Sequence, residues 1–96
     1  MTIEIKKSVD ELVLEITGRL DTITSPALDK TINENIAGIK SLILDFKHLK
    51  YISSAGLRVL LAAQKKAKGA MKLTNVCELV MEVFEMTGFA DILVIE

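Results

Sequence analysis

The chain is 96 residues long, a length that predicts one domain over residues 1–96. Half of its residues are hydrophobic, but only 4% are aromatic and tryptophan is absent, so we expect an aliphatic core. The 12 Lys and Arg residues and 13 Asp and Glu residues give a formal net charge of −1. That balance excludes the concentrated basic surface that nucleic-acid binding normally requires.

The location of the protein is suggested by three features of the sequence. Cys77 is the only cysteine, so it cannot form an internal disulfide, and it fits a reducing compartment. Residues 1–7 alternate polar and apolar side chains and lack the apolar stretch of a signal peptide. No run approaches the ~18 apolar residues of a transmembrane helix. We therefore expect a cytoplasmic protein that does not enter a membrane.

The first third of the chain predicts a hairpin and a helix. Residues 2–7 alternate in polarity, and the apolar residues over 12–16 predict a second strand that pairs with the first. Ser25 and Pro26 predict a helix start, with the serine as the capping residue and the proline at the first helical position. An apolar stripe at four-residue spacing then continues to Ile36.

The middle of the chain predicts a buried strand and a buried helix. Residues 42–44 are all apolar, as expected of a strand that is covered on both faces. Residues 45–51 predict a polar loop. Ser53 and Ser54 then open a second helix, which is apolar around most of its circumference.

The last third predicts a strand over 71–74, a third helix and a final strand over 92–95. Asn75 and Glu78 have the spacing of a capping box, and Gly88 fits the C-terminal cap of the helix. The helix has an apolar face, which comprises Val76, Leu79, Val80, Val83 and Phe84.

These elements predict an α/β domain with the order β-β-α-β-α-β-α-β. Strands that alternate with helices imply right-handed crossovers and a largely parallel sheet, to which the N-terminal hairpin adds an antiparallel edge. We expect a mixed sheet of about five strands with helices packed on it. The strands that contain 12–16 and 42–44 should be central. The residues expected to pack on the sheet are Leu57, Leu60, Val80 and Phe84.

Few residues suit catalysis. His48 is the only histidine. It could act as a general base for Ser53 or Ser54, but catalysis would also require a third group close to both. Cys77 has no second cysteine for a redox pair, and the isolated glycines form no phosphate-binding loop. We therefore expect no enzyme activity, no metal site and no cofactor.

Ser53 and Ser54 are the residues of most chemical interest, because they stand where a loop after a parallel strand meets a helix N-terminus. Unpaired backbone N–H groups and the helix dipole favour an anion there, including a phosphate. A simpler alternative stays open from chemistry alone: one serine caps the helix and the other has no role.

Three segments then carry a family resemblance: residues 18–21 (Gly-Arg-Leu-Asp), residues 44–61 with Tyr-Ile-Ser-Ser-Ala-Gly-Leu at 51–57, and residues 83–89 (Val-Phe-Glu-Met-Thr-Gly-Phe). They resemble three features of STAS domains, which are, in the same order, a recurrent loop, the serine signature, and the C-terminal helix with its exit turn. The form they resemble is the bacterial anti-sigma factor antagonist of the sporulation and stress type. The matches span nearly the whole chain.

The resemblance implies that Ser54 is a phospho-acceptor. In this family an anti-sigma factor, which is also an ATP-dependent serine kinase, binds the unmodified form, and the sigma factor is freed. Phosphorylation ends that binding, and a phosphoserine phosphatase restores it. The resemblance also implies a monomer in the free state. The implied partner-binding residues are Asp21, Thr22, Thr24, Ser53, Ser54, Ala55, Gly56 and Arg58.

Two residues depart from the family pattern. Ser53 stands where an Asp is usual, so it can still cap the helix but removes a carboxylate beside the acceptor. Arg58 stands where Gly is frequent; it could meet a partner, pair with the phosphate, or be an ordinary surface residue. Two other functions stay open: a STAS interaction module of a transporter or sensory assembly that is not phosphorylated, and a phosphocarrier component.

Overall fold

The order of the elements follows the predicted sequence of strands and helices. A computed structural model describes all of residues 1–96. Its elements are β1 (Thr2–Lys7), β2 (Glu11–Leu20), α1 (Ser25–Asn35), β3 (Ser41–Ile52), α2 (Ser54–Lys66), β4 (Met71–Thr74), α3 (Glu78–Thr87), the 3₁₀ helix η1 (Phe89–Asp91) and β5 (Val94–Ile95). The predicted α/β class and the order β-β-α-β-α-β-α-β are therefore confirmed.

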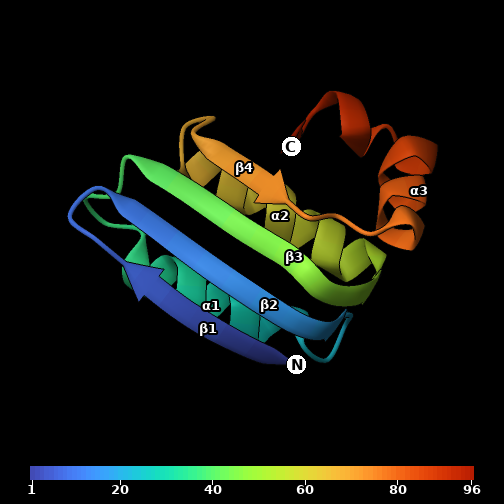
Figure 1. Cartoon of the computed structure of the whole chain (residues 1–96), viewed down its shortest axis with the longest axis horizontal. Helices are drawn as coiled ribbons and strands as arrows, with labels where there is room; N and C mark the ends of the chain where they lie inside the picture. Colours follow the sequence, from blue (N-terminus) through green and yellow to red (C-terminus); the bar gives the residue numbers. More distant parts are fainter.

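The strands form one mixed sheet in the order β1-β2-β3-β4-β5 (Figure 1). β1 runs antiparallel to β2, and every later pair of neighbouring strands is parallel. The predicted antiparallel edge is therefore present. The strands that contain 12–16 and 42–44 lie inside the sheet, as predicted.

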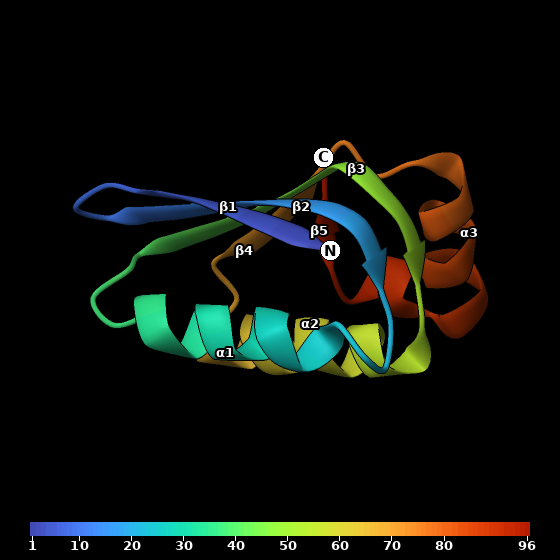
Figure 2. The same ribbon diagram turned by 90° about the horizontal axis from the view of Figure 1, so that it is seen from below.

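The helices lie on one side of the sheet. Figure 2 shows α1 and α2 side by side below it, and α3 at the end toward which β3 curves. Leu42 and Leu44 are fully buried, whereas Ile43 between them is partly exposed. The expectation that residues 42–44 are covered on both faces is therefore wrong. Their side chains alternate between the helix-covered face and an open face.

Residues 45–51, predicted as a polar loop, instead extend β3 to Ile52. Phe46 and Leu49 in this segment are buried in the core, although most residues next to them in the sequence are polar. Glu15 of β2 pairs with Asp45, but Thr17 pairs with His48, so β3 carries an extra residue at this point. Such a bulge breaks the alternation of polar and apolar residues by which a strand is recognised.

Two predicted helix caps are wrong. α1 begins at Ser25 itself, so Thr24 holds the cap position, and Ser25 Oγ is buried without a hydrogen-bond partner. α3 begins at Glu78 with Cys77 in the cap position, and no side chain caps its N-terminus. Asn75 lies outside the helix in the left-handed conformation (φ +56°), so it forms no capping box with Glu78.

The C-terminal segment agrees with prediction only in part. Gly88 ends α3 in the left-handed conformation (φ +82°), as predicted. The final strand is shorter than 92–95, because Ile92 still belongs to the turn that closes η1. Val80 and Phe84 are fully buried, but Leu79, expected on the same face, is 53% exposed.

The core is a single aliphatic cluster between the sheet and the helices. It contains 19 buried residues, of which only Phe46 and Phe84 are aromatic. Leu60 of α2 has no exposed surface and is part of this cluster. The aliphatic character expected from the composition is therefore confirmed.

Leu60→Ala is expected to lower the free energy of unfolding by about 2–5 kcal/mol, because the lost side chain leaves a cavity in the core. Leu79→Ala removes the same atoms from an exposed position of α3 and should change stability by less than about 0.5 kcal/mol. Urea unfolding followed by circular dichroism measures both values. Equal effects from the two substitutions would contradict the packing of α2 against the sheet.

Candidate functional site

The two serines lie at the start of α2, as the sequence predicted, but they follow β3 directly and not the predicted polar loop. β3 ends at Ile52, Ser53 holds the N-cap position with an extended backbone (φ −104°, ψ 178°), and Ser54 is the first helical residue. The N–H of Ser53 donates a hydrogen bond to the carbonyl oxygen of Leu20 (2.9 Å). This bond joins the start of α2 to the end of β2. Ser54 is exposed, so its hydroxyl faces solvent.

The side chain of Ser53 does not cap α2. Its Oγ is buried, and it makes no hydrogen bond within the protein. The first N–H groups of α2 therefore donate no bond to a capping side chain, and the positive end of the helix dipole lies beside Ser54. A phosphate on Ser54 would be placed close to these donors.

Gly56 allows α2 to start directly against the ends of two strands. A Cβ at this position would lie 2.7 Å from Ile52 Cγ1 and 3.0 Å from both Leu20 Cγ and the Leu20 carbonyl oxygen. Any larger residue would push the N-terminus of α2 away from β2 and β3. Gly56 is itself buried, so its place in the site is to permit this close approach.

The second loop of the site follows β2 and is held by its own hydrogen bonds. Thr24 Oγ1 donates to the carbonyl oxygen of Arg19 (2.7 Å) and accepts from the N–H of Asp21 (2.9 Å). Asp21 Oδ1 accepts from the N–H groups of Ile23 and Thr24 (3.0 Å each). Asp21 and Thr24 therefore fix the backbone of the loop, and Thr22 is left exposed near its tip.

These bonds also set the charge of Asp21. The backbone N–H of Thr24 is the main cause that lowers the pKa of Asp21 below its usual value, with partial burial acting in the opposite direction. Arg19 adds to the effect, since its Nε lies 3.7 Å from Asp21 Oδ2. The loop thus carries a fixed negative charge near neutral pH.

Arg19 and Tyr51 form a contact that the sequence did not predict. The guanidinium carbon of Arg19 lies 4.2 Å from the centroid of the Tyr51 ring, a cation–π geometry. The two residues pair across β2 and β3, in a register that includes a second irregularity between Gly18 and Arg19. Only a correct count of both bulges would have brought them together, because their spacing in the sequence carries no signal.

The hydrogen bond from Ser53 to Leu20 makes the serine junction and the loop after β2 neighbours at one end of the molecule (Figure 1). They bring together the residues that the family resemblance implied. The exposed members are Thr22, Ser54 and Arg58. The partly buried members are Asp21, Thr24, Ser53 and Ala55, and the buried member is Gly56.

The chemistry that surrounds His48 differs from the expectation of a loop histidine. His48 lies on β3, is exposed, and lines a hollow of about 310 Å³ on the open face of the sheet. Neither serine lines this hollow; its walls are formed by Glu15, Ile16, Thr17, Asp45, Lys47, His48 and Asn75. Nowhere do three or more His, Cys, Asp or Glu side chains come together in a way that could hold a metal ion. None of the helices has the length and apolar character needed to span a membrane.

The family model of the STAS domain matches residues 1–96, the whole of the chain. The chain belongs to the STAS domain family. The serine junction and the loop over residues 21–24 both lie within the matched range.

Three similar proteins extend this comparison of the STAS domain. The anti-sigma-B factor antagonist of Bacillus subtilis (strain 168) is 26% identical over 96 residues, which cover 97% of this chain and 88% of that protein. The anti-sigma factor antagonist SpoIIAA, solved in its unphosphorylated form, has a TM-score of 0.84 at 18% identity, covering 99% of this chain and 88% of that one. A sulfate transporter family protein from Wolinella succinogenes has a TM-score of 0.73 at 20% identity, and the match covers 86% of this chain and 74% of that one. The two structural likenesses show the fold.

Ser53→Ala is expected to change stability by less than about 0.5 kcal/mol, below the ~1 kcal/mol that loss of a helix cap typically costs. The physical reason is that the hydroxyl makes no cap bond to lose. Thr24→Val is the matched contrast, because it removes the hydroxyl that bonds to Arg19 and Asp21, and each such bond is worth about 0.5–1.5 kcal/mol. Chemical denaturation measures both. A loss of ~1 kcal/mol or more in Ser53→Ala would show that the serine caps α2 after all.

Asp21→Asn is expected to destabilise the domain in a pH-dependent way. Because the pKa of Asp21 is lowered in the folded state, the carboxylate stabilises the fold above its unfolded pKa of about 3.9. That contribution is lost as the pH falls through the lower folded pKa. The stability difference between wild type and Asp21→Asn should therefore be full near neutral pH and shrink below pH ~4. Urea unfolding at several pH values tests this, and a difference that does not vary with pH would contradict it.

Proposed function

We propose that this STAS domain is an anti-sigma factor antagonist whose partner binding is switched off by phosphorylation of Ser54. The observation that carries the proposal is the exposed hydroxyl of Ser54 at the first residue of α2, beside helix N–H groups that no side chain caps. The names of the relatives support the class of function. The Bacillus subtilis protein is an anti-sigma-B factor antagonist, and SpoIIAA is an anti-sigma factor antagonist. SpoIIAA has also been solved in a phosphorylated form, which matches this chain with a TM-score of 0.74.

The partner is an anti-sigma factor that is also a serine kinase. It binds the unphosphorylated domain on the surface formed by the two neighbouring loops, and this binding frees the sigma factor. Thr22, Ser54 and Arg58 supply exposed contact atoms. Asp21 supplies a fixed charge on a loop that is already ordered by hydrogen bonds, so little conformational entropy is lost when the partner binds.

Phosphorylation would change the surface without unfolding the domain. A phosphoserine adds about −1.5 to −2 charges, which the N-terminus of α2 accommodates because of its dipole and free N–H groups. A partner surface that fits a neutral hydroxyl must instead desolvate this charge, at a cost of several kcal/mol. Since ~1.4 kcal/mol corresponds to a tenfold change in affinity, binding falls by orders of magnitude.

Arg58 adjusts the size of this effect. It lies one helical turn after Ser54, it is exposed, and it takes part in none of the salt bridges of the protein. Residues four apart on a helix face each other, so the guanidinium can reach a phosphate on Ser54.

The catalytic steps of the proposed switch belong to the partner proteins. The kinase supplies ATP and the catalytic groups, a phosphoserine phosphatase reverses the modification, and the domain itself catalyses nothing. It needs no cofactor and acts in the cytoplasm as a monomer when free.

Titration of the cognate anti-sigma kinase with wild type, Ser54→Ala and Ser54→Asp tests the switch. Ser54→Ala should bind but accept no phosphate, whereas Ser54→Asp should lose at least about tenfold in affinity through its added charge. Ser53→Ala is the control and should remain a substrate, with phosphate located on Ser54 by mass spectrometry. Arg58→Ala should alter the difference between the modified and unmodified forms.

Equal affinities of the phosphorylated and unphosphorylated domain would overturn the switch. A partner that binds while no phosphate is ever found would indicate a STAS interaction module of a transporter or sensory assembly. Acid-labile phosphate on His48, instead of acid-stable phosphoserine, would indicate a phosphocarrier.

A further inference from the structure

α3 carries an apolar row whose two ends, Leu79 and Met86, are exposed, while Val83 between them is partly buried against the core. Val80 and Phe84 on one side of the helix are fully buried. Leu79, Val83 and Met86, spaced i, i+4 and i+7, follow a different side, where Leu79 is 53% and Met86 86% exposed. Residues at this spacing line one face of a helix, so the row is continuous.

A row of carboxylates runs beside the apolar row. Glu78, Glu82 and Glu85 have the same i, i+4 and i+7 spacing, and all are exposed. α3 contains no basic residue, and none of these carboxylates takes part in a salt bridge of the protein. The helix dipole favours Glu78 in the first turn but not Glu85 near the last turn, and like charges at this spacing repel each other in the free domain.

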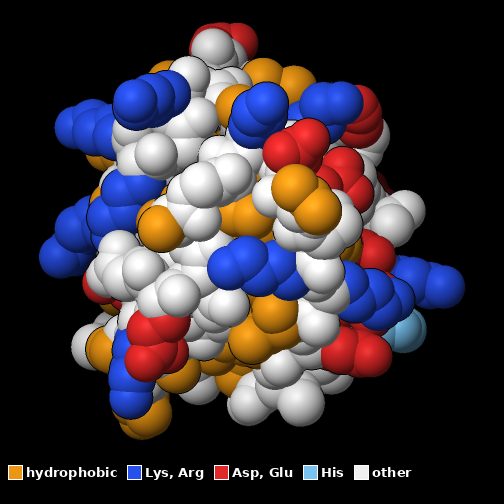
Figure 3. All heavy atoms as spheres, turned by 90° about the vertical axis from the view of Figure 1, so that its left-hand side faces the viewer, with side chains coloured by type: hydrophobic (Ala, Val, Ile, Leu, Met, Phe, Trp, Pro, Cys, Tyr) orange, Lys and Arg blue, Asp and Glu red, His pale blue; other side chains and the backbone are white.

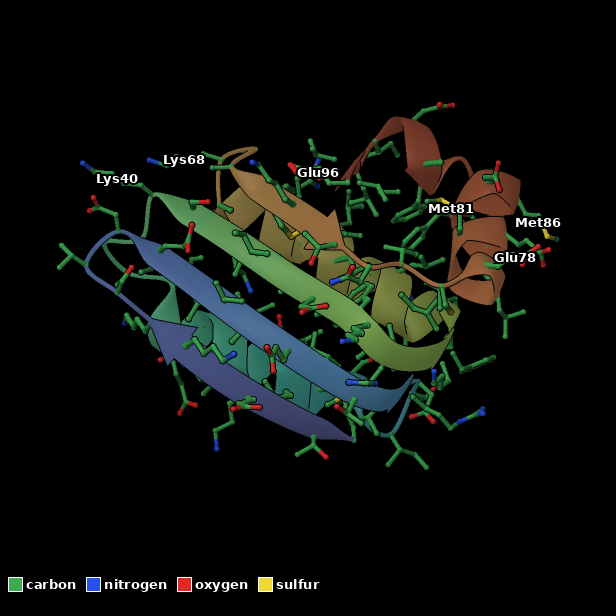
Figure 4. The ribbon with its side chains drawn as sticks, viewed as in Figure 1. Lys40, Lys68, Glu78, Met81, Met86 and Glu96 are labelled. Atoms are coloured by element: carbon green, nitrogen blue, oxygen red, sulfur yellow. The ribbon has the colours of Figure 1, made fainter.

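The two rows face away from the molecule. Figure 4 shows Glu78 and Met86 on the side of α3 that points outward, and Met81 on the side toward the other elements. Lysines are prominent at the opposite end of the molecule, which Figure 3 shows from outside and where Figure 4 labels Lys40 and Lys68. That end also carries acidic side chains, as Figure 3 shows, whereas α3 carries carboxylates and no basic residue, so α3 is the surface that attracts a cationic partner.

We propose that α3 is a second interaction surface, which docks a basic amphipathic helix of a partner protein. The partner's apolar side chains would cover Leu79, Val83 and Met86, and its Lys or Arg side chains would pair with Glu78, Glu82 and Glu85. This is the helix-against-helix mode of recognition, in which apolar anchors are flanked by complementary charges. The surface uses none of the residues of the serine junction, so we expect it to bind its partner whether or not Ser54 is modified.

Two other occupants fit the charges less well. A second copy that placed its own α3 against this one would bring two rows of carboxylates together, and like charges across an interface weaken it. An anionic membrane surface attracts basic segments and repels a row of carboxylates.

The test titrates the ¹⁵N-labelled full chain with a synthetic helical peptide that carries Leu at i, i+4 and i+7 and Lys and Arg on the flanking positions. Amide shifts should change over residues 78–86, and the affinity should fall as salt screens the charges. The charge-neutral triple variant Glu78→Gln/Glu82→Gln/Glu85→Gln should lose at least about tenfold in affinity. Glu34→Gln, an exposed carboxylate on α1, is the matched control and should bind as wild type does.

Leu79→Ser/Met86→Ser should also weaken binding, while Ser54→Asp should leave it unchanged, which separates this inference from the proposed switch. A peptide in which Glu replaces Lys and Arg should not bind. Shift changes outside α3, or none at all, would overturn the inference. Shifts in α3 that depend on protein concentration without peptide, together with a dimer in sedimentation, would assign the surface to a second copy and overturn it too.

Discussion

The site depends on the close contact between the start of α2 and the ends of β2 and β3. Gly56 leaves no side chain between the helix and the Leu20 carbonyl, and the Ser53 N–H bonds to that same oxygen. One carbonyl oxygen thus positions both the serine junction and the loop that begins at Asp21. If the helix were displaced there, the serine junction and the loop after β2 would separate.

Much of the fold could be predicted because many of its helices and strands produce patterns of polar and apolar residues that are local in the sequence. The apolar residues of 12–16, the alternation of 71–74 and the cap at Gly88 each depend on neighbours along the chain. Residues 45–51 could not be read in this way. Two extra residues in β3 break the alternation of buried and exposed side chains along the strand. Lysines and a histidine therefore stand next to the buried Phe46 and Leu49, and the segment has the polarity of a loop. The open face of the sheet was missed for a related reason, since Leu42 to Leu44 are all apolar whichever way they point.

The identity of the site residues was more predictable than their physical roles. Family resemblance pointed to Ser54, and the structure places Ser54 at the first turn of α2 with its hydroxyl exposed. The resemblance gave no reason for Gly56 and no role to the contact of Arg19 with Tyr51. Those roles depend on distances between strands, which residue types alone do not encode. Ser53 shows the opposite case, because a residue suited to capping occupies the cap position without making the bond.

The edges of the sheet limit how this STAS domain can associate with other chains. β5 is two residues long, and β1 at the other edge carries Glu4, Lys6 and Lys7. Short or charged edge strands are poor templates for the backbone of another chain, and proteins use them to prevent aggregation. The proposed function requires that the domain release its partner after phosphorylation, whereas a strand added to the sheet would dissociate slowly. Recognition is therefore left to loops and helices, where side-chain contacts can be formed and broken.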